Sequence, residues 1–265
     1  LAGVTYFWDI AAKLPGAAKD LPWGVTANLI VRRSTPDGVA FDLQFPKTGG
    51  GEDIDFVLRK RAYALAHGGT GFQAAPDVVV THPWWNGGRR SYWRFYMWSK
   101  GDGGLVRMYP ELTYFGGAPN SAEFFLFGAA LLLLGVFAVV AADSSWLLGF
   151  SVKMLFATLL ANVVHDVYRH LWRDAGRTLS MNTSVIGVRW FAAVVESSFI
   201  RMFSECGRVA GILERGEVML LGRRFDWFAG RVGDGPMIEE RMNARQRAVM
   251  IVVILMVICR VSLMV

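Results

Sequence analysis

FFLFGAALLLLGVFAVVAA, residues Phe124–Ala142, is a run of 19 residues without a charged side chain. A helix needs about 20 predominantly apolar residues to cross the hydrocarbon core of a bilayer. The composition of the chain agrees with such a setting, because 53% of its 265 residues are hydrophobic and 13% are aromatic, which is high for a soluble protein. The stretch therefore predicts a transmembrane helix.

Two further stretches also predict membrane spans. Residues 144–164 carry a single charged side chain, Lys153, and residues 248–265 carry only Arg260, close to the end of the chain. Both stretches are long and apolar enough to cross a bilayer as helices. Together with the first stretch they give three expected spans.

Residues 179–200 are a candidate fourth span that contains two charged residues, Arg189 and Glu196. Seven residues are nearly two helical turns, so both side chains would share one face and could pair toward protein. The pattern predicts an all-α transmembrane helical anchor of three to four spans with an N-terminal polar α+β extension. The expected units are an extension of mixed strand and helix (1–119), an anchor core (120–204, with spans near 124–142, 144–168 and 180–200), and a polar segment with a C-terminal transmembrane helix (205–265).

The N-terminal extension contains local signals for strands and a helix. VTANLIVRR (25–33) and GVAFDLQF (38–45) flank the turn sequence STPDG and predict two strands. EDIDFVLRKRAYALAH (52–67) predicts a short helix, which the two glycines that follow would stop. SYWRFYMW (91–98) and LVRMY (105–109), around SKGDGG, predict a hairpin.

The net charge of +6 indicates a membrane surface rather than nucleic acid as the partner, because the arginines cluster beside the predicted spans. Such positions hold orientation signals and contacts to anionic phospholipids such as cardiolipin. The two cysteines, Cys206 and Cys259, are far apart and form no CxxC motif, so the sequence supports neither a disulfide framework nor a zinc or iron–sulfur site. The clustered arginines are Arg169, Arg173, Arg177, Arg241, Arg245 and Arg247.

HDVYRHLWRDAGRTL (165–179) concentrates ionisable residues at the end of the second predicted span. If the α-helix continues through this stretch, its ionisable residues form two neighbouring stripes, one basic and one acidic, each with one residue every four positions. One interpretation is a helix end whose arginines mark the inner side of the membrane, with aspartates that offset them. The other is a membrane-surface site for an anionic or redox group, such as haem propionates or a quinone head group. The basic stripe is His165, Arg169, Arg173 and Arg177, and the acidic one is Asp166, His170 and Asp174.

RHLWRDAGRTL (169–179) resembles the signature of the large cytochrome b membrane-anchor subunit, the C subunit, of succinate dehydrogenase, respiratory complex II. That signature reads Arg-His-Leu-x-Trp-Asp-x-Gly-Lys/Arg-x-Leu, and Trp172 stands one place early. The resemblance covers roughly residues 110–200, and the remaining segments make this chain an enlarged and divergent relative. The residues in register are Arg169, His170, Leu171, Asp174, Gly176, Arg177 and Leu179.

A second match lies upstream, where PELTY (110–114) resembles the family's Pro-His-Leu-Thr-Ile-Tyr segment. In the family a serine follows, with an arginine four residues later and a glycine seven residues later. This chain has Ser121 and Gly128 at that interval, but Phe125 stands in place of the arginine. Ser121 begins the first span and the signature ends the second, so both are expected on the same side of the membrane, which the arginines mark as the matrix.

The resemblance implies a multi-pass subunit of the mitochondrial inner membrane, with its N-terminal extension on the matrix side, that is not catalytic alone. Its expected partners are the flavoprotein and iron–sulfur subunits and a second small membrane-anchor subunit, with membrane lipids around it. Ubiquinone would be reduced near the matrix surface. The implied quinone-binding residues are Ser121, Arg169 and Asp174.

Haem b is the second cofactor that the resemblance implies, with His165, His170 and Arg169 as the haem-binding residues. The family's axial histidine lies six residues before the signature arginine, and that position is Val163 here. His165 is two residues away, about 200° around a helix. It is the only candidate iron ligand nearby.

Two other classes of function stay open at this point. The chain could be a non-catalytic accessory subunit of another mitochondrial membrane complex, whose extensions contact neighbouring respiratory complexes. A small transporter subunit could instead use Arg189 and Glu196 as an intramembrane pair. The proteins that co-purify with the chain would distinguish these classes.

Overall fold

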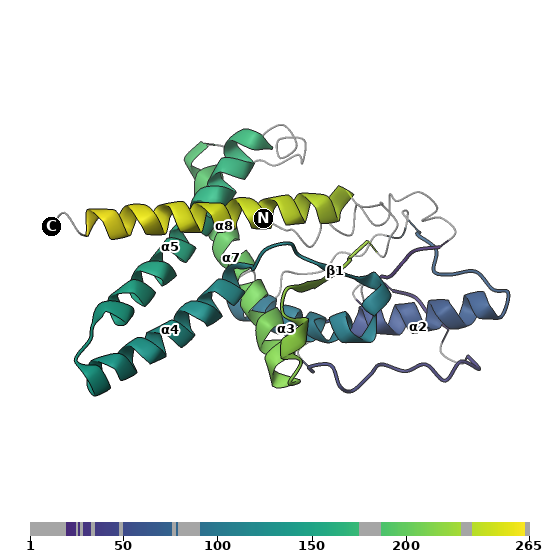
Figure 1. Ribbon diagram of the computed structural model, residues 1–265. Coiled ribbons are helices and arrows are strands. Elements are labelled where there is room, and N and C mark those ends of the chain that lie inside the picture. Colours follow the sequence, from purple (N-terminus) through teal and green to yellow (C-terminus); the bar gives the residue numbers. More distant parts are fainter. Residues whose placement is uncertain are drawn as a thin grey trace.

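The computed structural model describes residues 20–24, 26, 29–32, 35–47, 50–75, 78, 91–174, 187–228 and 235–262. This part of the chain is mostly helical (Figure 1). The elements are α2 (Glu52–Ala66), α3 (Tyr92–Met108), η3 (Pro110–Leu112), β1 (Thr113–Phe115), α4 (Ser121–Ala142), α5 (Trp146–Tyr168), η4 (Arg169–Arg173), α7 (Gly187–Glu214), η5 (Val218–Leu220), β2 (Arg223–Phe225) and α8 (Gly235–Val261).

Helices α4 and α5 form an antiparallel hairpin. Asn120 caps α4 and forms a reciprocal capping box with Glu123, whereas Asp143 ends the helix in a left-handed conformation with φ 48°. A β-carbon at Gly128 would lie 2.7 Å from Leu155, and one at Gly135 would lie 2.6 Å from Leu148, so these glycines allow the two helices to pack closely. Within the described residues, two helical stretches are long and apolar enough to cross a membrane, Ser121–Ala142 and Trp146–Arg173.

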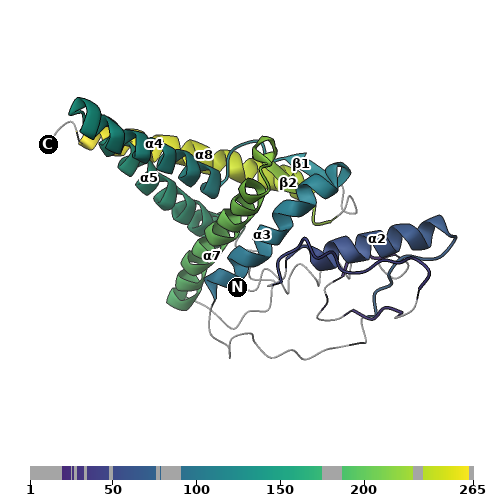
Figure 2. The same cartoon turned by 90° about the horizontal axis from the view of Figure 1, so that it is seen from below.

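Helix α8 packs against α5 and crosses it at an angle in Figure 1, with side-chain contacts at Gln246 and Arg247; Figure 2 shows the two helices on the same side of α7. In the apolar C-terminal half of α8, Ile251 is buried, whereas Val252, Val253 and Met256 expose about half of their surface. The last 18 residues of α8 (244–261) contain three arginines, Arg245, Arg247 and Arg260, and α8 is not among the two helices that meet the length and composition requirement for a span.

Helix α7 does not follow the course expected for a span over 180–200. It begins at Gly187, extends to Glu214 and crosses the ends of α4 and α5 in both views (Figures 1 and 2). Residues 180–186 lie outside the described part of the chain. Glu196 accepts a hydrogen bond of 3.4 Å from Tyr92 of α3, whereas Arg189 is exposed, so these two residues do not form the predicted intramembrane pair. The main packing partner of α7 is α3 rather than a membrane helix.

The predicted hairpin over residues 91–109 is wrong, because this stretch forms the helix α3. Ser91 caps it by accepting a hydrogen bond of 3.3 Å from the Arg94 amide. Gly101, Gly103 and Gly104, which indicated a turn, lie within the helix and are buried. Their missing side chains let the α3 backbone approach its neighbours, and a β-carbon at Gly103 would lie 2.9 Å from the Arg208 carbonyl oxygen of α7.

The strand predicted over 38–45 is also absent, and several residues of the one predicted over 25–33 lie outside the described part of the chain. The expected helix over 52–67 is present as α2. Strand β1 pairs antiparallel with β2, with Tyr114 opposite Arg224, and so joins the segment before α4 to the segment after α7. The expected N-terminal and C-terminal polar units therefore form one lobe.

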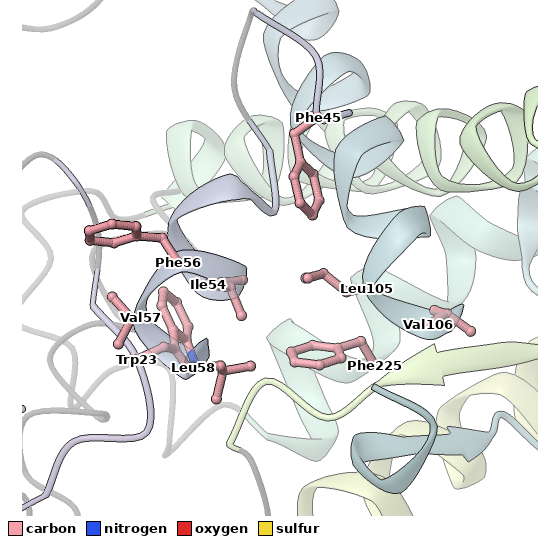
Figure 3. Packing of buried hydrophobic residues seen from close by; sticks show 9 residues of the cluster. All are labelled: Trp23, Phe45, Ile54, Phe56, Val57, Leu58, Leu105, Val106 and Phe225. Atoms are coloured by element: carbon pink, nitrogen blue, oxygen red, sulfur yellow. The ribbon is translucent and has the colours of Figure 1, made fainter. Parts of the chain in front are cut away.

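The lobe has an apolar core of its own (Figure 3). Ile54 and Leu105 face each other across α2 and α3, with Phe225 of β2 beside them. Asp55 is fully buried in α2, where it accepts hydrogen bonds from Tyr109 (2.7 Å) and Arg59. The core residues are Trp23, Phe45, Ile54, Phe56, Val57, Leu58, Leu105, Val106 and Phe225.

Asp102 makes the stability of this lobe dependent on pH. Burial raises its pKa to about 8, although Arg208 offsets part of the effect, and burial raises the pKa of Asp53 to about 6. The folded state therefore retains a proton on Asp102 that the unfolded chain releases near pH ~4. Stability is full below that pH and falls as the pH rises to the folded-state pKa.

We expect Asp102→Asn to remove this fall in stability with rising pH. Asp53 has lost most of its proton at about pH 6.5, so above that pH the change in stability comes mainly from Asp102. The difference in melting temperature between the variant and the wild-type protein should therefore grow between about pH 6.5 and pH 8. Circular dichroism melts at several pH values in mild detergent would measure it. Parallel pH profiles for the two proteins would contradict the assignment.

Candidate functional site

The start of α4 meets α7 at Ser121. This serine is 2% exposed, and both its backbone amide (2.9 Å) and its hydroxyl (2.5 Å) donate to the same carboxylate oxygen of Glu205. Burial tends to raise the pKa of Glu205, but the charges of Arg201 and Arg247, with the Ser121 hydrogen bond, lower it to about 2. The Glu205 carboxylate is therefore ionised at neutral pH.

Arg201 connects Glu205 to the end of α5. Its Nη1 donates to Glu205 Oε1 at 2.7 Å, and its Nε and Nη2 donate to Asp166 Oδ2 at 3.0 and 2.9 Å. Nη2 also donates to Asn162 Oδ1 at 2.8 Å, and Ser198 donates to Asp166 at 2.8 Å. One guanidinium thus holds two carboxylates in the fixed fork geometry that arginine offers.

His165 continues this set of contacts to α8. Its side chain is fully buried, with Nδ1 3.3 Å from Asp166 Oδ1 and Nε2 3.2 Å from Gln246 Oε1. Arg173 donates to the same Gln246 oxygen at 2.8 Å. Because arginine only donates, this oxygen is an acceptor, and His165 Nε2 must carry a hydrogen.

Nine residues therefore form what we call the buried ion network. Arg247 of α8 adds a second positive charge, 3.8 Å from Asp166. Two arginines thus face two carboxylates, so the network holds its charges in compensating pairs, which makes charge burial tolerable. The members are Ser121, Asn162, His165, Asp166, Ser198, Arg201, Glu205, Gln246 and Arg247.

The residues after α5 do not continue the two α-helical stripes. Arg169–Arg173 form a π-helical turn, in which the Asp174 amide donates to the Arg169 carbonyl at 2.8 Å. The wider turn brings Asp174 to both Arg173 (2.9 Å) and Arg169 (3.1 Å), and these hydrogen bonds hold the pKa of Asp174 below its usual range. Arg169 also donates to Glu239 of α8 at 2.6 Å. We call Arg169, Arg173, Asp174 and Glu239 the outer cluster, and its hydrogen bonds connect the end of α5 to α8.

An open apolar pocket of about 510 Å³ lies beside the network. Phe125 is one turn after Ser121 on α4, and Met202 and Cys206 directly follow Arg201 and Glu205 on α7. The pocket is therefore built on the same helix segments as the network. Its lining residues are Trp93, Tyr96, Phe125, Leu159, Phe199, Met202, Phe203 and Cys206.

The residues singled out from the sequence fall into different parts of this region. Ser121 and His165 belong to the buried ion network, whereas Arg169 and Asp174 belong to the outer cluster, and His170 is partly exposed. Three further members of the network, Arg201, Glu205 and Gln246, were not predicted from the sequence. The one local signal was the spacing of Arg201 and Glu205, which lie four residues apart and so share a helix face.

The described residues do not fit a haem with His165 as its axial ligand. An axial histidine needs a free ring nitrogen, but both nitrogens of His165 lie within hydrogen-bond distance of other side chains. The described part of the chain also contains no group of three or more His, Cys, Asp or Glu residues that could hold a metal ion. No chemical step is therefore derived through haem.

No family model, curated protein or solved structure matches this chain. The resemblance to the complex II anchor thus stands on the motifs between residues 110 and 200 alone.

Proposed function

We propose that this chain is a membrane-anchor subunit of succinate dehydrogenase in the mitochondrial inner membrane, and that it forms part of the ubiquinone-reduction site. One observation carries the proposal: Ser121, at the start of α4, is connected through Glu205 and Arg201 to Asp166, three residues before the signature that begins at Arg169. Ser121 and Asp166 are 45 residues apart in sequence and share one buried network, which therefore connects the serine of the upstream motif to the helix turn just before the signature.

The proposed anchor has three spans, α4, α5 and the C-terminal half of α8. The last apolar stretch, from Ala248 onward, directly follows the contact of α8 with α5 at Gln246 and Arg247 and would cross the bilayer near α5. In this proposal the end of α5 faces the matrix, which the arginines at that end support. The lobe around α2 then lies in the matrix, where it would contact the flavoprotein and iron–sulfur subunits.

The pocket and its neighbours have the chemistry that a quinone needs. A quinone ring presents two carbonyl oxygens that accept hydrogen bonds, and its tail is apolar. The eight lining residues supply an apolar and aromatic surface. The Ser121 hydroxyl and the Arg201 guanidinium, which donate to Glu205 and Asp166 in this structure, lie on the adjoining helix segments and would have to turn from these carboxylates to the quinone oxygens. In this proposal Arg201 takes the place of the family arginine that Phe125 replaces, and the outer cluster at Arg169 and Asp174 holds η4 in position.

The proposal is tested first by the partners and activity of the native assembly. Purification in mild detergent should yield covalent flavin and succinate-dependent quinone reduction with the tagged chain. An assembly with neither would contradict the proposal and favour an accessory subunit of another complex.

Ser121→Ala tests the quinone pocket itself. Loss of one hydrogen bond, about 1–1.5 kcal/mol, should raise the apparent KM for quinone roughly ten-fold. Ser151→Ala is the matched control, because Ser151 is also fully buried but bonds only the Leu148 carbonyl of its own helix. Equal KM values for the two variants would place the quinone elsewhere.

A further inference from the structure

Helix α7 has three faces, and two of them have partners within the chain. At 100° per residue, Ser198, Arg201 and Glu205 share one face, which forms the buried ion network with α4 and α5. Gly207 and Gly211 lie about 120° away and pack against the α3 backbone. The third face is available to contact the lipid or solvent around the protein.

This third face is an apolar stripe without any charged side chain. Its six members recur every three or four residues, which is the spacing of one helix face. Three of them are well exposed, Val188 by 84%, Phe191 by 47% and Phe203 by 46%. The stripe consists of Val188, Phe191, Val195, Phe199, Phe203 and Cys206.

The stripe is continuous with the surface of the membrane helices. Phe199, Phe203 and Cys206 line the pocket together with Phe125 of α4 and Leu159 of α5. The adjoining side chains on those helices are exposed and apolar, namely Leu126 (39%), Phe127 (57%), Phe156 (55%) and Leu160 (37%). The stripe and the lipid-facing surfaces of α4 and α5 therefore border the same open pocket.

The direction of α7 excludes a second transmembrane course. The helix crosses the ends of α4 and α5 (Figure 1), and Figure 2 shows the bundle of α4, α5 and the C-terminal half of α8 on one side of it, with α2 on the other. If α4 and α5 cross the bilayer, α7 lies at its surface.

We infer that α7 is an interfacial helix whose apolar stripe docks on the lipid bilayer, so that the pocket opens sideways to the acyl chains. A helix of this kind lies in the plane of the interface with its apolar face buried about 5–10 Å into the headgroup and acyl boundary. The inference rests only on the part of the proposed function in which α4 and α5 span the membrane. It needs neither quinone nor succinate dehydrogenase partners.

Nitroxide depth measurements test this inference on the full chain in phosphatidylcholine and phosphatidylglycerol vesicles. After Cys206→Ala and Cys259→Ala, a single label is placed at Phe203→Cys, at Leu133→Cys, an exposed position near the middle of α4, or at Leu43→Cys, a lobe residue that is 95% exposed. Collision rates with oxygen and with a water-soluble nickel chelate give the depth of each label.

The Phe203 label should lie about 5–10 Å below the headgroups, between an aqueous Leu43 label and a Leu133 label near the bilayer centre. Three results would overturn the inference: nickel access equal to that at Leu43, a depth equal to that at Leu133, or no collision with either reagent, which means that protein covers the stripe. A Leu133 label in water would instead contradict the membrane course of α4, and with it the proposed function.

Discussion

Arg201→Gln will destabilise the protein by about 3–5 kcal/mol, because it leaves Asp166 and Glu205 buried beside one another without their shared counter-charge. Both carboxylates are almost fully buried, and Arg201 donates one hydrogen bond to Glu205 and two to Asp166. Glutamine keeps a similar reach but no charge. Unfolding in mixed micelles on titration with dodecyl sulfate, followed by circular dichroism, measures the loss.

Arg189→Gln is the matched control for this variant. Arg189 lies on the same helix but is exposed, and a surface substitution away from packed features changes stability by no more than about 0.5 kcal/mol. If the two variants unfold at the same detergent fraction, Arg201 does not hold the network together. A large loss at Arg201 alone would support the contact between α4, α5 and α7 on which the proposed site depends.

Gly207→Ala is expected to cost about 3 kcal/mol, because a β-carbon at this position would overlap the Tyr96 carbonyl oxygen of α3. Backbone cannot move aside as a flexible side chain can. Helices α3 and α7 would have to separate, which would also strain the hydrogen bond of 2.5 Å between Ser99 and Ser204. The same detergent titration reports the change.

Gly149→Ala provides the comparison, since nothing lies within 4 Å of a β-carbon built at that helical glycine. Alanine favours a helix over glycine, so the result should fall between no change and a gain of about 1 kcal/mol. Equal losses for both variants would mean that glycine is needed for the helix backbone rather than for contact between α3 and α7.

Local sequence patterns predicted the helices whose formation depends on a single continuous segment of the chain. The uncharged run at Phe124–Ala142 is apolar on every side, which only a lipid-facing or deeply buried helix tolerates, and it forms most of α4. The helix predicted over 52–67 is likewise present as α2. In both cases the signal is contained within one continuous segment.

The hairpin predicted for α3 is wrong and the candidate span over 180–200 is not confirmed, because the partners of α3 and α7 lie elsewhere in the chain. Among the glycines that resemble a hairpin turn in α3, Gly103 lies against Arg208 of α7, about one hundred residues later in the sequence, and Gly101 lies against Gly50. The apolar stretch that indicated a span over 180–200 reflects a helix with separate faces for α3, for the membrane-helix ends and for its surroundings. A hydropathy count averages these faces and cannot distinguish them.

The candidate site divides in the same way. Apolar length and the charged end of α5 follow from single segments, so the sequence was sufficient to place Ser121 and the signature at corresponding helix ends. The partners of those residues, Arg201, Glu205 and Gln246, come from α7 and α8. Their role depends on burial, since an arginine and a carboxylate become bound to each other when packing removes the water that would otherwise solvate them. That packing exists only once helices distant in sequence have assembled.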